Sequence, residues 1–161
     1  MHDDNPANSA PAGTTAPPDR QYLLERVGEA AVVQLYADGF RALSLREKTL
    51  VWHLYQAAIA GRDIFYDQRH RYHLEMRDLL EAIVAHRSSC DLDTFEEIER
   101  YTKLFWINTG AYNNLTARKF VLTCGPERFA AAAHAAVRAG GVVPLRAGES
   151  LDDLLERLRP M

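Results

Sequence analysis

Apolar residues recur at helical spacing through most of the chain, and polar or glycine-containing segments separate the runs. The first run contains Leu24, Val27, Ala31 and Leu35 and ends before the Asp-Gly pair at 38–39. Because an α-helix turns once every 3.6 residues, apolar residues three or four positions apart share one face. The spacing therefore predicts a first helix that starts at Tyr22 and stops at the Asp-Gly pair.

A second helix is predicted from its start signal. Ser44 and Glu47 have the capping-box spacing, in which each side chain binds a free backbone N–H of the first turn. Apolar residues then occupy most of the helix circumference as far as Gly61. This distribution is typical of a helix that is buried on several sides, so we expect it at the centre of the core. A polar connection at 61–71 should follow it.

Four further helices are predicted by the same spacing. Their apolar stripes lie at 76–83, 98–105, 129–137 and 151–158. The segment 88–93 should end the first of them, Gly125 and Pro126 mark a helix start, and residues 142–145 form a short extended stretch. We therefore predict an all-α fold, a compact domain of about six helices with little or no sheet. The last helix has little chain around it to cover its apolar residues, so we expect further polypeptide to complete the domain.

Composition divides the chain into two parts. Residues 1–20 are rich in Pro, Ala, Asn and Thr with almost nothing to bury, which predicts a disordered leader. Residues 21–161 contain all the helical patterns and should form one helical lobe. The chain has 22 acidic and 19 basic residues intermixed, a net charge of -3, which argues against nucleic acid and anionic membranes as partners. No apolar run approaches the roughly 20 residues of a membrane span. We expect a soluble protein, with the cytoplasm favoured over the periplasm.

The segment between the fourth and fifth predicted helices is the strongest candidate for a binding site. Asn108, Gly110, Tyr112, Asn113 and Asn114 lie between an aromatic helix end and a Lys-Phe pair. A carboxamide donates and accepts hydrogen bonds at once, and glycine lets a backbone approach a ligand closely. These properties suit the binding of a peptide backbone. Alternatively, the asparagines cap their own main chain and only end the helix.

Other polar residues are weaker candidates for a functional site. In the segment that contains His70, His73 and Glu75, the two histidines are three residues apart and could share one helix face as metal ligands, but no third partner and no HExxH spacing is defined. The alternative for these three is a solvated loop and helix start. His53, among aromatic and aliphatic neighbours, is expected to be a hydrogen-bonded core residue. Asp63 and Asp67 are typical of a solvated acidic turn.

Motifs for enzymatic chemistry are absent from the sequence. It contains no GxSxG, no phosphate-binding glycine loop and no dinucleotide fingerprint. Cys90 and Cys124 are far apart and define neither a disulfide framework nor a zinc site. The residues alone therefore predict no catalytic group, no metal ligand and no cofactor in this chain.

Two stretches carry a resemblance to a known family. The capped helix with the segment that follows it (LSLREKTLVWHLYQAAIAGRDIFYDQ), and the loop NTGAYNNLTARKFV with its Pro-initiated helix, resemble the N-terminal part of the dipeptidyl peptidase III family. The similarity spans roughly residues 22–145. That family consists of zinc exopeptidases whose HExxGH motif binds the metal and supplies the catalytic glutamate. This chain has no HExxGH, so zinc is implied for a full-length relative only.

The resemblance implies a specific role for the asparagine loop. In the family, the loop that corresponds to 108–115 lines a peptide cleft, although an aromatic residue often stands near the position of Leu115. We therefore expect a substrate-cleft lobe of such a peptidase, with Asn108, Gly110, Tyr112, Asn113 and Asn114 in contact with a peptide substrate. The missing catalytic lobe would be its other partner, and isolated activity is not expected. Two alternatives stay open: a non-enzymatic helical protein-interaction module, and a metal hydrolase that uses His70, His73 and Glu75.

Overall fold

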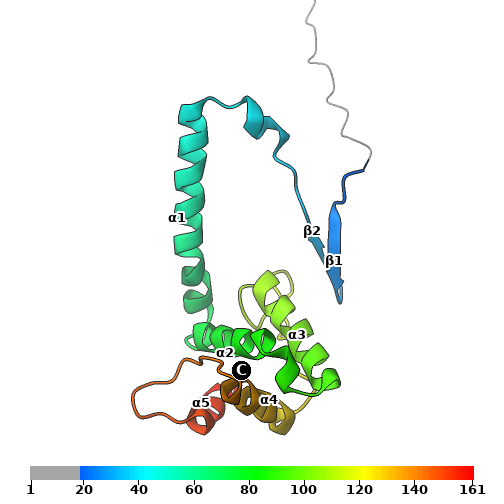
Figure 1. Cartoon of the computed structure of the whole chain (residues 1–161), viewed down its shortest axis with the longest axis vertical. Coiled ribbons are helices and arrows are strands. Elements are labelled where there is room, and N and C mark those ends of the chain that lie inside the picture. The colour runs from blue at the N-terminus through cyan, green and yellow to red at the C-terminus, as the bar shows by residue number, and fades with distance from the viewer. Residues whose placement is uncertain (1–18) are drawn as a thin grey trace, which may run out of the picture.

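The computed structural model describes residues 19–161, which contain five α-helices, two 3₁₀ turns and one two-stranded sheet (Figure 1). The α-helices are α1 (Leu45–Arg69), α2 (His73–Ala85), α3 (Leu92–Ile107), α4 (Pro126–Arg138) and α5 (Leu151–Leu158). The prediction of an all-α fold with little sheet is confirmed. The leader predicted at 1–20 lies outside the described residues except for its last two positions, where Arg20 forms an ion pair with Asp38 at 2.6 Å.

The first predicted helix is wrong, because residues 23–33 form a β-hairpin. Strand β1 (Leu23–Val27) pairs antiparallel with β2 (Ala30–Val33), and Val27 lies opposite Ala30 across a two-residue turn. Gly28 in the turn has φ +59°, a conformation that glycine adopts at low cost. The 3₁₀ turn η1 (Asp38–Ala42) then leads to α1. Lys103 of α3 binds Glu25 of β1 at 2.7 Å and ties the hairpin to the helical body.

The packed core lies between α2, α3, α4 and α5. Its fully buried side chains come from the stripes that the spacing predicts, and they include Leu79, Leu80, Ile83, Ile98, Tyr101, Phe105, Ala133, Ala136 and Leu154. Helix α5 is covered after all, since Leu151, Leu154 and Leu158 are buried against this core. The expectation that its apolar face lacks cover is therefore wrong. Residues 142–145 form no strand in the structure.

Helix α1 has the predicted capping box but not the predicted burial. Ser44 Oγ accepts from Glu47 N–H, and Glu47 Oε2 accepts from Ser44 N–H at 2.8 Å. The helix continues through the predicted polar connection to Arg69, and only Tyr66 is buried. Nine large apolar side chains on α1 leave between 41% and 81% of their surface exposed: Leu45, Leu50, Val51, Trp52, Leu54, Tyr55, Ile59, Ile64 and Phe65. Helix α1 is thus not the centre of the core of the described chain.

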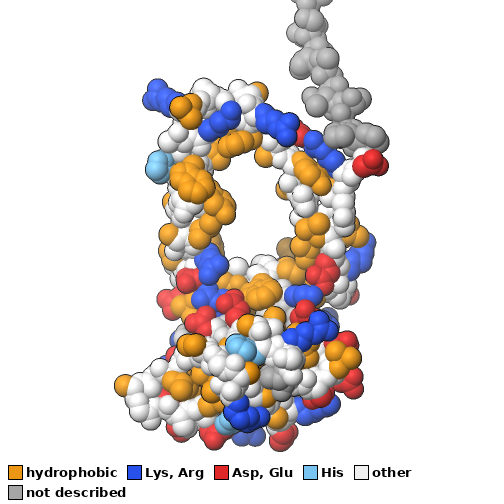
Figure 2. Space-filling view, viewed as in Figure 1, with side chains coloured by type: hydrophobic (Ala, Val, Ile, Leu, Met, Phe, Trp, Pro, Cys, Tyr) orange, Lys and Arg blue, Asp and Glu red, His pale blue; other side chains and the backbone are white. Residues whose placement is uncertain are grey.

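Only the C-terminal turns of α1 contact the helical body. The Tyr66 ring stacks on Phe105 with 5.8 Å between centroids, and Arg77 of α2 binds Asp63 at 2.6 Å. Beyond these turns α1 extends away from α2–α5 (Figure 1). Figure 2 shows an opening between α1 and the hairpin, with apolar side chains along both of its edges. A helix with apolar residues around its whole circumference is thus held by one end.

Candidate functional site

The asparagine loop is a small hairpin that leaves the end of α3 and returns beside it. Tyr112 pairs with Lys119 in an isolated antiparallel bridge, and Phe120 N–H donates to the Ala111 carbonyl at 2.8 Å. Asn113 N–H donates to the Arg118 carbonyl at 2.9 Å. These bonds give residues 111–120 a defined backbone conformation, so the loop has a fixed geometry at the surface of the helical body.

Asn108 holds the start of the loop. Its side chain is buried, and its Nδ2 donates to the Leu104 carbonyl at 2.9 Å while its Oδ1 accepts from Asn114 N–H at 3.0 Å. Arg69 of α1 donates to the Asn108 carbonyl. Both ends of the carboxamide are therefore used within the chain, and the last residue of α1 is joined to the loop.

Asn113 and Asn114 differ in what their side chains can reach. Asn113 Oδ1 accepts from the N–H groups of Leu115 and Thr116, each at 2.9 Å, and so forms an Asx turn at the loop tip. Asn114 is exposed. Tyr112, with 36% of its surface exposed, lies on the same loop. Among the five predicted contact residues, Tyr112 and Asn114 are the two that are exposed, and Asn113 is partly exposed with its Oδ1 used within the loop.

Gly110 is required by a close contact with His73. It has φ +143°, and a Cβ at this position would lie 2.3 Å from Cε1 and 2.6 Å from Nδ1 of the His73 ring. The ring is fully buried, and its Nε2 accepts from Ala111 N–H at 3.3 Å. The His73 ring thus packs directly against the loop. Gly110 makes this internal contact possible, a role that differs from close approach to a ligand.

The environment of His73 keeps its ring neutral. Burial, with smaller contributions from the nearby His70 and Arg69, lowers the pKa of His73 to about 4. The Tyr66 carbonyl opposes this effect, but it is not in hydrogen-bond geometry, and Nδ1 has no hydrogen-bond partner. Since Nε2 accepts a hydrogen bond, the neutral ring carries its proton on Nδ1.

The three residues of the alternative metal site do not converge. The His70 and His73 rings lie 5.3 Å apart, but Glu75 binds Arg146 at 3.0 Å and also binds Arg157. Between residues 19 and 161, no group of three or more His, Cys, Asp and Glu side chains is placed to hold a metal ion. Glu75 instead connects α2 to α5 and to the segment before it.

The remaining candidate residues are exposed on the surface or take part in contacts within the fold. His53 is exposed on α1, so the prediction of a core histidine is wrong. Asp63 binds Arg77, which holds the pKa of that carboxyl below its usual value, and Asp67 is exposed. Cys90 and Cys124 are free thiols whose pKa values are raised by burial.

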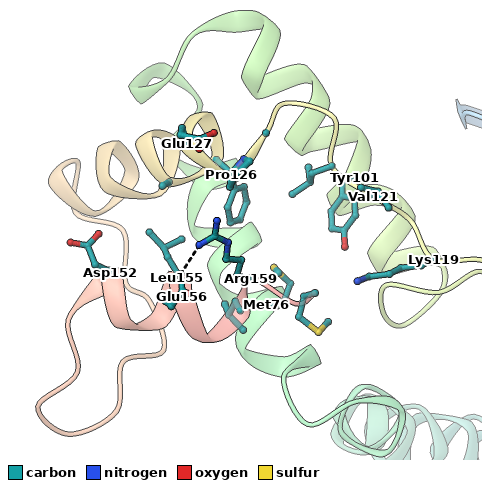
Figure 3. A pocket seen from close by; sticks show the side chains of 16 residues that line it. Met76, Tyr101, Lys119, Val121, Pro126, Glu127, Asp152, Leu155, Glu156 and Arg159 are labelled. Atoms are coloured by element: carbon teal, nitrogen blue, oxygen red, sulfur yellow. Dashed lines mark hydrogen bonds and ion pairs between the residues drawn. The ribbon is translucent and has the colours of Figure 1, made fainter.

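Sequence reasoning missed two features next to the loop. Arg69 and Arg77 join α1 to the helical body, and an arginine in a charged segment carries no signal for such a contact. A groove of about 530 Å³ lies between α3, α4 and α5, and Lys119 at the end of the loop lines it (Figure 3). Its walls come from four segments distant in sequence, so no local pattern predicts it.

Comparison with known proteins adds no family. No protein-family model matches the chain, and no curated protein matches it significantly. In the part that the structure describes, no helix has both the length and the apolar character needed to cross a bilayer.

Proposed function

We propose that this chain is the helical substrate-cleft lobe of a dipeptidyl peptidase III-like zinc exopeptidase, and that a second polypeptide body carrying the zinc completes it along α1. The proposal rests on the resemblance of residues 22–145 and on one observation, the exposed apolar circumference of α1. Hydrolysis belongs to the second body, because no HExxGH occurs in these 161 residues.

The energetics of α1 support a second body. Its 25 residues span about 37 Å, and its nine exposed apolar side chains present about 1,000 Å² if a large side chain offers roughly 150–250 Å². A specific interface buries about 800 Å² per partner. Leaving such a surface in water is unfavourable by about 25 cal/mol for each Å². A partner that covers α1 on more than one side would remove this cost.

The loop supports the peptide-binding part of the proposal. Its backbone is fixed by the bonds of Asn108 and Asn113, so the main chain that carries the exposed Tyr112 and Asn114 has little freedom to lose on binding. In this proposal Tyr112 supplies an aromatic wall and Asn114 binds the peptide backbone. Asn108, Gly110 and Asn113 act through the shape of the loop.

Two measurements test the proposal. The first is the coding sequence: an HExxGH motif in the same reading frame, or in a companion protein that co-purifies with this chain, is expected. The second is calorimetric titration with short peptides, for which we expect a Kd no tighter than millimolar, because a few hydrogen bonds net about 1 kcal/mol each and one wall of the cleft is absent. Submicromolar binding by the isolated chain would contradict the half-cleft.

A non-enzymatic interaction module is the second candidate, and the exposure of α1 favours it equally. The two functions differ in what binds. An interaction module associates with its partner through α1 and binds no peptide. The cleft lobe associates through α1 and also binds peptides. Trp52 provides the readout, since it is exposed on α1 and Trp106 is the only other tryptophan in the sequence. In a Trp106→Phe variant, a blue shift of the emission on adding a co-purified protein reports that α1 is covered.

A further inference from the structure

The groove between α3, α4 and α5 has an apolar floor. Its volume of about 530 Å³ is in the range of sites that hold small organic ligands. Phe129 and Leu158 of the floor are only 9% and 2% exposed, so they belong to the packed core. The whole floor consists of Met76, Leu122, Phe129, Leu155 and Leu158. Because the core holds these side chains in place, the floor is preformed.

The Tyr101 hydroxyl is an unused polar group in the wall of this groove. Tyr101 is only 2% exposed, and its ring packs in the core beside Phe105. Within residues 19–161 its hydroxyl has no hydrogen-bond partner, although the hydroxyl of a buried tyrosine normally finds one. Figure 3 shows this hydroxyl directed toward the end of the groove where Lys119 lies. A ligand in the groove can therefore supply the missing partner.

Two hydrogen-bond donors meet at this end of the groove. Burial raises the pKa of Tyr101 to about 12, so the hydroxyl keeps its proton at neutral pH and can donate it. Lys119 Nζ donates to the Pro160 carbonyl at 2.7 Å, and it forms no ion pair within the described residues. An ammonium group has further N–H donors, which are left for a ligand. One positive charge beside one hydroxyl suits a carboxylate, whose two oxygens can accept from both.

The opposite end of the groove disfavours a second anionic group. Figure 3 shows Asp152 and Glu156 away from Lys119. Asp152 is paired with His134 at 2.7 Å and Glu156 with Arg159 at 3.1 Å, so both carboxylates already have a partner within the chain. A second carboxylate brought to this end would meet like charges. The groove therefore fits a ligand with a single carboxylate at the Lys119 end and an uncharged apolar body.

We propose that this groove binds a small aliphatic monocarboxylate, whose carboxylate accepts from Lys119 Nζ and the Tyr101 hydroxyl and whose tail lies on the apolar floor. Burial of the tail contributes most of the affinity, and the two donors fix the orientation of the ligand. The proposal goes beyond the peptide-binding function and does not rest on it.

Chemical-shift titration of the isotopically labelled chain with three probes tests the ligand class. The probes are octanoate, octylamine, which has an equally long tail and the opposite charge, and acetate, which lacks the tail. Octanoate should bind with a submillimolar Kd, at least about 10-fold tighter than the other two, because it alone supplies both a carboxylate and an apolar tail. The amide signals of Lys119, Leu122 and Leu155 should shift. Equal affinity for octylamine, or for acetate, would overturn the proposal.

Substitutions at the two donors locate the carboxylate. Lys119→Met should weaken octanoate binding by about 10-fold or more. Arg118→Met is the matched control, because it removes the same charge from a neighbouring exposed residue that does not line the groove. The control should leave the Kd for octanoate unchanged.

Tyr101→Phe removes only the hydroxyl. This variant should bind octanoate about 5-fold more weakly, yet resist denaturant as well as the unmodified chain, because the hydroxyl has no partner in the free protein. If Lys119→Met does not fold, Tyr101→Phe decides alone. An unchanged Kd for octanoate in Tyr101→Phe would show that the hydroxyl does not face the ligand, and the proposed site would be wrong.

Other occupants of the groove give different results. The peptide N-acetyl-Ala-Ala-Leu also carries one carboxylate beside an apolar group. If it binds more tightly than octanoate, the occupant is the carboxyl terminus of a polypeptide and the small acid is wrong. Groove signals that move with protein concentration alone would show a second copy as the occupant and would also overturn the proposal. The search for an HExxGH motif tests the peptidase lobe independently of all these results.

Discussion

Gly110 lies against the buried ring of His73 so closely that a Cβ at position 110 would be 2.3 Å from Cε1 of the imidazole. The contact joins the first residue of α2 to the loop that follows α3. Through Ala111 N–H, which donates to His73 Nε2, the same ring also sets the backbone of the next residue. The position of Tyr112 at the surface therefore depends on packing beneath it.

Gly110→Ala should destabilise the protein by about 2–4 kcal/mol, since a clash with a buried ring adds to the strain at positive φ. Gly148→Ala is the matched control, because Gly148 also has positive φ but nothing lies within 4 Å of its Cβ position. The control should lose only about 1 kcal/mol. Chemical denaturation of both variants measures the difference, and equal losses would mean that the His73 contact does not matter.

Truncation of two leucines should change the stability of the protein to very different extents. Leu80 is fully buried and Leu54 on α1 is 60% exposed. Leu80→Ala should cost about 2–5 kcal/mol, whereas Leu54→Ala should change the free energy of unfolding of the monomeric chain by no more than about 0.5 kcal/mol. Denaturation at low protein concentration, with sedimentation to establish the monomer, tests this. A large loss for Leu54→Ala would indicate that α1 is packed in solution.

The behaviour of α1 illustrates what a sequence pattern conveys. The capping box at Ser44 and Glu47 is a local signal, and the helix starts where it predicts. Apolar residues around the circumference indicate that a helix is to be buried but not by what, and the described chain supplies no cover for Trp52 or Leu54. The stripes on α2 to α5 were predictable because one-sided patterns find their partners within the chain.

The β-hairpin and the loop were harder to predict for physical reasons. Leu24, Val27 and Ala31 fit helical spacing, but a glycine at φ +59° reverses the chain after Val27 and pairs the two halves. In the loop, the sequence offers Asn108 and Asn113 as ligand contacts, yet their carboxamides bind the main chain of their own segment. Residue type alone does not distinguish these uses, because the same amide serves either. Whether Tyr112 and Asn114 bind a peptide stays a prediction.

Arg77→Ala should loosen the attachment of α1. The guanidinium lies over the Tyr66 ring at 5.1 Å and binds Asp63 at 2.6 Å, and its own side chain is only 10% exposed. Because Asp63 is half exposed, we expect a modest loss of stability, about 1–2 kcal/mol. Hydrogen exchange should become faster in residues 62–69 and stay unchanged in α4.

Arg77→Lys separates charge from shape. Lysine keeps the positive charge but cannot bind Asp63 and Asp78 at once with a planar fork. We expect most of the increase in exchange to appear in this variant as well. Protection equal to that of the unmodified chain would show that charge alone holds α1.

The stability of the protein should fall between pH 6.5 and about pH 4 because of His73. An unfolded histidine titrates near pH 6.5, whereas burial lowers the pKa of His73 to about 4 in the folded chain. Between these values the unfolded state binds a proton that the folded state excludes, so stability is lost as the pH falls, by at most about 3 kcal/mol in total. The carboxyl groups of Asp63, Asp91 and Asp153 have lowered pKa values and lose their contribution to folding stability only below the ordinary range of an aspartate.

The pH dependence of the free energy of unfolding, measured for the unmodified chain and for His73→Gln, isolates the contribution of the histidine. The variant should be less stable at pH 7 and should show a flatter profile from pH 6.5 to 4. Identical slopes in that range would mean that His73 is protonated as easily in the folded chain as in the unfolded one.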